Sequence, residues 1–143
     1  MRRYGATCTR NVNVTFGRKC FHLFYALINY FFVATCVGYA NGNTENPTYE
    51  EVYTDTTGYA ETVRVEYNPD IIGIELLVRL YFDSIDPTSL NRQGNDVGTR
   101  YRTGIYYTEQ ADIPTIREVY NTVEKAIGEP LAVEVEPLNR FYP

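Results

Sequence analysis

The chain has 143 residues, of which 44% are hydrophobic and 22% charged, so it is long enough for one folded domain and too short for two. Its formal net charge is -5, but this charge is unevenly divided. Residues 1–44 hold five basic side chains and no acidic one, whereas residues 45–143 hold 8 basic and 18 acidic ones. An acidic main body argues against a general nucleic-acid binder, which needs a basic face to neutralise phosphates.

The basic N-terminal quarter also holds all three cysteines, Cys8, Cys20 and Cys36. The charge split indicates either a basic functional arm or a segment with a different history from the rest. The cysteine spacings and the single histidine do not fit a structural zinc site. An odd number of cysteines favours a reducing compartment such as the cytoplasm. By composition alone, each cysteine is expected to be a small buried hydrophobic residue.

Residues 1–10 are expected to form a flexible N-terminus, and the alternation of polar and apolar residues over 11–16 predicts a short strand. Residues 20–39 contain no charged side chain, which leaves two interpretations. One is a buried helix over 21–30 followed by a strand over 32–37. The other is a membrane span that starts on the cytoplasmic side. The first is favoured because the rest of the chain lacks a complete fold without this segment.

The remainder of the chain alternates between strand and helix patterns. Thr48 and Glu51 predict a capping box that opens a short helix ending at Tyr53. Apolar residues at helical spacing predict a second helix over 71–85. The other predicted elements are a strand over 61–67, a polar loop over 86–99, a strand over 102–107, a helix over 112–126 with Pro114 in its first turn and Gly128 after its end, and a strand over 131–135.

This order of elements predicts an α+β fold in which helices cover a face of the sheet. We expect a ferredoxin-like two-layer α/β sandwich with a mixed sheet, formed by residues 11–143 as a single domain. No internal repeat or low-complexity run interrupts the pattern.

Three segments of the chain carry distinctive motifs. They are Gly38–Gly42 followed by Asn46–Val52, then Thr57–Val63, then Ile85–Thr88 followed by Gln93–Arg102. In order and spacing these motifs resemble those of the A-type peptide methionine sulfoxide reductases, thiol enzymes that repair oxidised methionine in proteins. The stretches 133–136 and 141–143 more weakly resemble the family's C-terminal strand and the turn after it, and we expect the family's C-terminal tail to be missing.

The resemblance implies three catalytic residues. Cys20 would be the nucleophile that attacks the sulfoxide sulfur, Glu61 the acid that protonates the leaving oxygen, and Asp96 the carboxylate that orients the site. The family has glycines where this chain has Arg18 and Lys19. A cysteine at a helix N-terminus beside these two cations favours the thiolate, because the helix dipole and the cations all stabilise the anion.

The resemblance also implies the residues that bind the substrate. Tyr49 and Tyr101 would donate hydrogen bonds to the sulfoxide oxygen. Phe21 and His22 would line the pocket for the methyl group of the substrate. Because the family has tryptophan at position 22, the smaller and polar His22 should weaken substrate binding. Spacing could not single out two of the 14 tyrosines; only the motifs do so.

The implied function is thiol-dependent reduction of methionine S-sulfoxide, free or in proteins, through a cysteine sulfenic acid and without a cofactor or metal. A second thiol must regenerate the enzyme, and Cys36, Cys8 or an external thiol such as thioredoxin could supply it. We expect a cytoplasmic monomer that binds neither nucleic acid nor a membrane. Two alternatives remain: a catalytically impaired relative with a remodelled N-terminal segment, and a membrane-tethered interaction domain.

Overall fold

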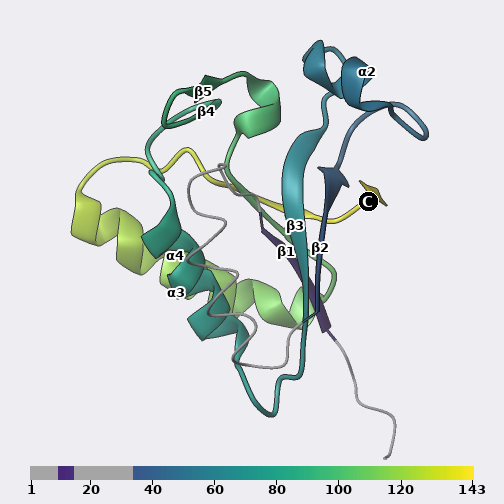
Figure 1. Ribbon diagram of the computed structural model, residues 1–143. Helices are drawn as coiled ribbons and strands as arrows, with labels where there is room; N and C mark the ends of the chain where they lie inside the picture. The colour runs from purple at the N-terminus through teal and green to yellow at the C-terminus, as the bar shows by residue number, and fades with distance from the viewer. Residues whose placement is uncertain (1–9, 15–33) are drawn as a thin grey trace, which may run out of the picture.

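The computed structural model describes residues 10–14 and 34–143 (Figure 1). Cys8, Cys20, Phe21 and His22 therefore lie outside the described residues, as does the helix expected over 21–30. Along the chain the elements are β1 (Arg10–Val14), β2 (Ala34–Ala40), α2 (Tyr49–Tyr53), β3 (Ala60–Tyr67), α3 (Ile74–Ser84), β4 (Arg92–Gln93), β5 (Asp96–Val97), the 3-10 helix η1 (Thr99–Tyr101), β6 (Gly104–Tyr107), the 3-10 helix η2 (Gln110–Asp112), α4 (Ile113–Ile127), β7 (Glu134–Pro137) and β8 (Phe141–Tyr142).

The main sheet of the described residues has the strand order β7-β6-β1-β3-β2-β8. Strand β1 is antiparallel to β3 and β6, and β2 is antiparallel to β3 and β8. Strand β7 runs parallel to its neighbour β6, so the sheet is mixed, as predicted. Strands β4 and β5 pair with each other in a separate hairpin.

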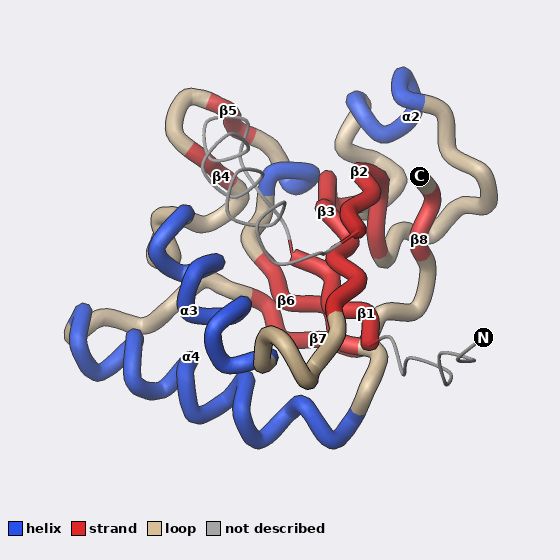
Figure 2. The backbone as a smooth tube through the Cα atoms, turned by 60° about the horizontal axis from the view of Figure 1, so that its bottom comes forward, coloured by secondary structure: helices blue, strands red, loops and turns tan. Residues whose placement is uncertain are grey.

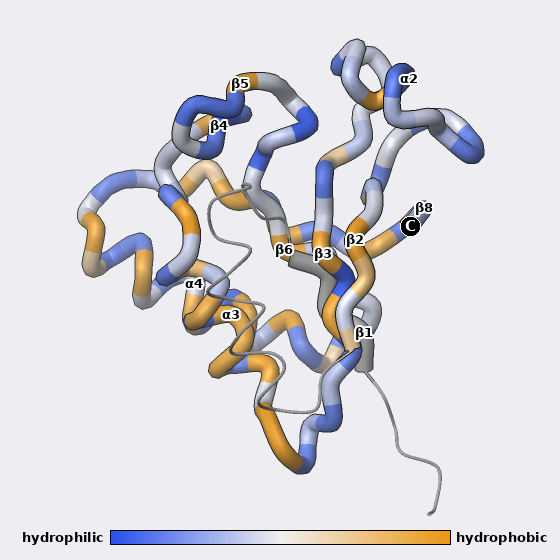
Figure 3. Tube along the Cα trace, in the orientation of Figure 1, coloured by the Kyte–Doolittle hydropathy of each residue, from blue (hydrophilic) through white to orange (hydrophobic). Residues whose placement is uncertain are grey.

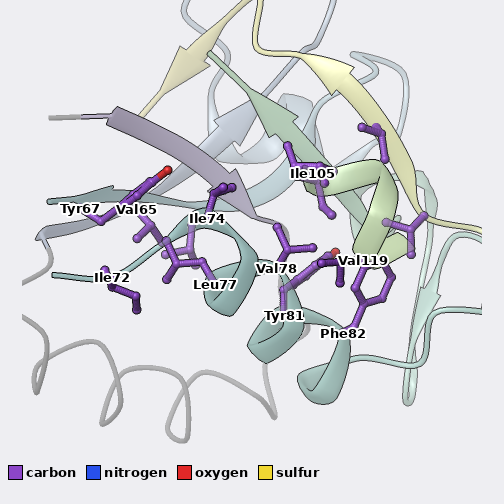
Figure 4. Close-up of a cluster of buried hydrophobic side chains, with 14 residues drawn as sticks. Val65, Tyr67, Ile72, Ile74, Leu77, Val78, Tyr81, Phe82, Ile105 and Val119 are labelled. Atoms are coloured by element: carbon purple, nitrogen blue, oxygen red, sulfur yellow. The ribbon is translucent and has the colours of Figure 1, made fainter. Parts of the chain in front are cut away.

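Helices α3 and α4 lie against one face of the sheet and form a second layer (Figures 1 and 2). Side chains of α3 at helical spacing are buried, namely Ile74, Leu77, Val78, Tyr81 and Phe82. They belong to one core with Val65 of β3, Ile105 of β6 and Val119 of α4 (Figure 4). Each fully buried apolar side chain of this size stabilises the fold by roughly 1.5–3 kcal/mol. The mixed α/β architecture expected from the sequence is confirmed.

The predicted helix boundaries that depended on capping are confirmed. Thr48 Oγ1 accepts a hydrogen bond from the Glu51 amide at 3.2 Å, and the Glu51 carboxylate accepts one from the Thr48 amide at 2.8 Å. These two bonds are the capping box of α2, which ends at Tyr53. Gly128 ends α4 with a φ of 79°, in the left-handed region that glycine adopts without strain.

Several strand boundaries differ from the sequence expectations. The strand expected over 131–135 is wrong in position, because the Leu131 amide donates to the Glu124 carboxylate and the Ala132 amide to the Pro87 carbonyl. Pairing with β6 begins only at Glu134. Strand β2 continues beyond the predicted end at Val37 because its pairing with β3 extends to Ala40.

The polar loop expected over 86–99 contains the β4–β5 hairpin, and β8 was not predicted as a separate strand. Figure 3 shows that this hairpin and the loops around α2 are mainly hydrophilic, whereas apolar residues follow α3 and the central strands. Within the described ranges, no helix is both long enough and apolar enough to cross a membrane. Residues 34–39, the end of the uncharged stretch, lie in β2.

Candidate active site

Glu61 lies at the start of β3, directly opposite Tyr39 of the antiparallel strand β2. Opposed residues on such a pair share one face of the sheet, with about 4.5–5.5 Å between their Cβ atoms. Both side chains are half-buried. On its other side Tyr39 pairs with Tyr142 of β8, so the three side chains form a row across the sheet.

Helix α2 and η1 bring two further phenols to this row. Burial raises the pKa of the Tyr39 phenol, and negative charge on Glu61, Tyr49, Glu50 and Tyr101 raises that pKa further. These four groups therefore lie near enough to Tyr39 to act on it electrostatically. Tyr49 is 52% exposed on α2, whereas Tyr101 of η1 is buried. The structure thus brings three of the predicted site residues, Glu61, Tyr49 and Tyr101, together around Tyr39.

Arg100 fixes α2 to η1. Its guanidinium stacks on the ring of Tyr53 at 4.2 Å and on that of Tyr101 at 4.5 Å. Nη1 of Arg100 donates to the Tyr53 carbonyl at 3.1 Å and to Asp55 Oδ2 at 2.8 Å. Burial by itself opposes the charge on Arg100, but hydrogen bonds and charge from Tyr101 and Asp55 outweigh it, so the pKa of the guanidinium lies above its usual value. A buried, paired cation therefore holds the rings of Tyr53 and Tyr101 in place, and only Tyr101 is a predicted site residue.

Asp55 and Gly98 complete this connection. Oδ1 of Asp55 accepts hydrogen bonds from the Thr99 hydroxyl and the Arg100 amide, each at 3.2 Å. A Cβ on Gly98 would lie 2.6 Å from Oδ2 of Asp55, and the φ of Gly98 is 149°. Only glycine allows the Asp55 carboxylate to approach η1 this closely.

Arg102 joins η1 to the start of β3 and to β7. Its Nη1 donates to the Thr99 carbonyl at 3.1 Å, and its Nη2 donates to the Gly58 carbonyl at 2.9 Å. Its Nε donates to the Glu134 carboxylate at 3.1 Å, and the Tyr106 hydroxyl donates to the same oxygen at 2.9 Å. The segments that carry Glu61 and Tyr101 are thereby held at a fixed separation.

Tyr59 stands where the resembled family normally has histidine. Its ring is buried, and its hydroxyl donates to the Thr44 carbonyl. A Cβ on Gly42 would lie 2.1 Å from this ring, so glycine is required there. Tyr59 also makes an edge-to-face contact with Tyr142, with 5.9 Å between ring centroids. The first motif of the sequence therefore packs on the second.

Asp96 is not brought into this group by any contact among the described residues. It is half-buried on β5, opposite Gln93 of β4, in the hairpin that precedes η1 (Figure 1). Its predicted role as an orienting carboxylate stays a prediction.

Cys36 lies on β2 opposite Arg64 of β3. Successive side chains on a strand alternate between faces, so Cys36 and Tyr39, an odd number of positions apart, point to opposite sides of the sheet. The Cys36 thiol donates a weak hydrogen bond to its neighbour, the Val37 carbonyl, at 3.7 Å. The sulfur of Cys36 is therefore on the face opposite Glu61.

Sequence reasoning missed Tyr39, Arg100 and Asp55. Tyr39 and Arg100 lie within the quoted motifs, but nothing in a motif says which of its residues face one another. The sequence feature that could have identified Tyr39 is the strand pattern after Gly58, which contains Glu61. It would have placed Glu61 opposite Tyr39 only if the pairing register of the two strands had been known.

The family model described as peptide methionine sulfoxide reductase matches residues 12–143. The chain is 48% identical over 126 residues to the peptide methionine sulfoxide reductase MsrA of Lachnoclostridium phytofermentans, covering 88% of this chain and 73% of that protein. Against the MsrA of Clostridium acetobutylicum the identity is 49% over 108 residues, covering 76% and 67%.

Among solved structures, the chain is similar to reduced Mxr1 from Saccharomyces cerevisiae with a TM-score of 0.88 and 30% identity, covering 98% of this chain and 82% of that one. The structure of Mxr1 in complex with Trx2 matches with a TM-score of 0.70 and 23% identity, covering 99% and 84%.

Proposed function

The chain belongs to the A-type peptide methionine sulfoxide reductase family, and we propose that its Cys20 and Glu61 carry out the thiol-dependent reduction of methionine S-sulfoxide. The observation that carries this proposal is the convergence of Glu61, Tyr49 and Tyr101, from three separate elements, near the start of strand β3. Together these groups offer one acid and two phenols to a sulfoxide oxygen. That set is suited to the charge that develops on this oxygen as the S–O bond breaks.

In the proposed reaction the Cys20 thiolate attacks the sulfoxide sulfur, and Glu61 gives its proton to the sulfoxide oxygen. Tyr49 and Tyr101 donate hydrogen bonds to the same oxygen. The protonated oxygen then moves from the substrate sulfur to the sulfur of Cys20: the substrate S–O bond and the S–S bond made by the attack both break, and a new S–O bond forms on Cys20. Cys20 becomes a sulfenic acid, and methionine leaves as the thioether. The sulfur of the substrate is reduced by two electrons, and the sulfur of Cys20 is oxidised by two.

Regeneration requires two thiols. The first condenses with the sulfenic acid, forms a mixed disulfide with Cys20 and releases water. The second attacks that disulfide and returns the Cys20 thiol. We propose an external dithiol of the thioredoxin kind as the reductant, because Cys36 faces the other side of the sheet from Glu61. The yeast protein Mxr1, which forms a complex with Trx2, offers a parallel.

The remaining assignments are part of the same proposal. Asp96 would orient the site from the β4–β5 hairpin, and Phe21 and His22 would bound the methyl pocket. The enzyme would act as a cytoplasmic monomer. An anchor over residues 20–39 is not favoured, because residues 34–39 pair with β3.

We also propose a ferredoxin-like topology. Strands β1, β2, β3 and β6 lie in the order β6-β1-β3-β2, with β3 between β1 and β2 and all neighbours antiparallel. An inserted strand of this kind is the mark of a split βαβ unit. A superposition of these four strands on a ferredoxin-like sheet with matching strand directions would support the assignment.

The function is tested by turnover of a peptide that contains methionine S-sulfoxide, with dithiothreitol as reductant. The wild-type chain should release the thioether, Cys20→Ser should be inactive, and Glu61→Gln should lose about 100-fold to 10,000-fold in kcat. Cys36→Ser is the matched control and should keep its activity. Undiminished turnover by Cys20→Ser would contradict the proposal, as would a wild-type chain with no activity on this peptide.

A further inference from the structure

The row Glu61–Tyr39–Tyr142 contains two phenols for which the proposed reaction has no role, and Tyr39 is the one that lies next to Glu61. Tyr39 is opposite Glu61 in the β2–β3 register, on the same face of the sheet. On its other side Tyr39 pairs with Tyr142. The phenols of Tyr49 and Tyr101 and the carboxyl of Glu50 lie near enough to act on it electrostatically. Strand pairing places two of these side chains directly opposite Tyr39, Glu61 on β3 and Tyr142 on β8, and of the two only Glu61 is a predicted catalytic residue.

We propose that Tyr39 is a positioning residue for Glu61, and that its phenol donates a hydrogen bond to the carboxylate that Glu61 becomes when it protonates the sulfoxide. This inference rests on the proposed function. Proton transfer leaves a negative charge on a half-buried side chain. A hydrogen bond to an ionised group is stronger than one to a neutral group, so such a donor stabilises the state after the transfer more than the state before it.

The surroundings of Tyr39 favour the donor role. Burial, followed by the negative charges on Glu61, Tyr49, Glu50 and Tyr101, raises the pKa of the phenol, so the hydroxyl keeps its proton throughout the working pH range. Arg100, the cation of η1, is engaged by Asp55 and Tyr53. The phenol of Tyr39 is therefore a neutral donor beside an acid that changes its charge.

The sign of the pH effect follows from this arrangement. A hydrogen bond to the carboxylate lowers the pKa of Glu61, and activity requires the protonated form. Activity therefore falls as the pH rises through the pKa of Glu61. In Tyr39→Phe the carboxylate loses one of its donors, so the pKa of Glu61 should rise by about one unit. The alkaline limb of the rate profile should move to higher pH by the same amount, while kcat at its plateau should fall about tenfold.

Two measurements test the proposal, one of which does not depend on turnover. The first is the pH titration of the Glu61 carboxyl by 13C NMR, assigned with Glu61→Gln, in the wild type, Tyr39→Phe and Tyr142→Phe. The proposal expects a raised pKa in Tyr39→Phe and no change in Tyr142→Phe, the neighbour on the far side of the row. An unchanged titration in Tyr39→Phe, or an equal shift in both variants, would overturn it even if the chain proved inactive.

The second measurement is a double-mutant cycle on kcat. If Tyr39 acts through Glu61, Tyr39→Phe should cost about tenfold in the wild type and nothing further in Glu61→Gln. Equal losses in both backgrounds would mean that Tyr39 has a merely structural role. The circular dichroism spectrum of Tyr39→Phe, which keeps the ring, should match that of the wild type.

Discussion

The position of Tyr101 in the site is set by its contact with Arg100, a residue with no proposed catalytic role. Arg100 stacks on Tyr53 and Tyr101 and is neutralised by Asp55. Lysine could not replace it, because an ammonium group cannot stack on two rings and donate in a planar fork at the same time. The phenol of Tyr101 is thereby fixed before any substrate arrives, which is the condition for effective stabilisation of a developing charge.

Loss of the Tyr101 hydroxyl should therefore be costly. In Tyr101→Phe the ring still packs beside Arg100, but one donor to the sulfoxide oxygen is missing, so we expect kcat to fall by about 100-fold. Turnover of the methionine S-sulfoxide peptide measures this. Tyr53→Phe is the control, because it keeps the ring that Arg100 contacts and should retain wild-type kcat. A loss of less than twofold in Tyr101→Phe would remove this residue from the site.

At the scale of elements, η1 is held by a turn that tolerates only glycine. Gly98 has a φ of 149°, and the Asp55 carboxylate occupies the space that a Cβ would need. This close approach joins the loop after α2 to η1, so the elements that carry Tyr49 and Tyr101 are held to each other. The 3-10 turn is thus a structural part of the site.

The substitution Gly98→Ala should cost about 1–3 kcal/mol in the free energy of unfolding, because it adds a backbone strain and displaces Asp55. Chemical denaturation measures this cost. Gly94→Ala is the matched control, since Gly94 also has a positive φ, of 60°, but no atom lies within 4 Å of its Cβ. It should therefore show the milder strain of a left-handed residue without a displaced neighbour, and so a smaller loss than Gly98→Ala. Equal losses in the two variants would show that the contact between Gly98 and Asp55 is unimportant.

At the scale of the whole molecule, the sheet separates two sets of side chains. Glu61 and Tyr39 point to one face, and Cys36 and Arg64 to the other. Strand β2 pairs with β3 along its whole length, so the side chain of Cys36 cannot turn to the opposite face without breaking hydrogen bonds of this ladder. With Cys20 on the Glu61 side, as the proposed reaction requires, a disulfide between Cys20 and Cys36 would need the partial unfolding of β2.

Regeneration should therefore not involve Cys36. We expect Cys36→Ser to turn over with thioredoxin at a rate within about twofold of the wild type, because the mixed disulfide forms directly on Cys20. Mass spectrometry of the protein after one sulfoxide turnover, without reductant, should detect no Cys20–Cys36 crosslink. A stoichiometric crosslink between these two residues would contradict the expectation and would place them on the same side of the sheet.

The sequence by itself determined the features that depend on local chemistry or on a motif. The capping box of Thr48 and Glu51, the buried stripe of α3 and the end of α4 at Gly128 are all properties of neighbouring residues, so they could be predicted without a fold. The motifs also indicated the family and the identities of Glu61, Tyr49 and Tyr101. The local features needed only the spacing of residue types, whereas the family and the site residues came from the resemblance of the motifs.

Tertiary structure decided which of these residues meet. The position of β7 depends on its pairing with β6, and the facing of Tyr39 and Glu61 depends on the register of β2 against β3. The separation of Cys36 from Glu61 follows from the same register. Pairing partners and register are set by contacts between residues far apart in the chain, and a strand pattern alone is compatible with several registers. Only the folded sheet removes that ambiguity.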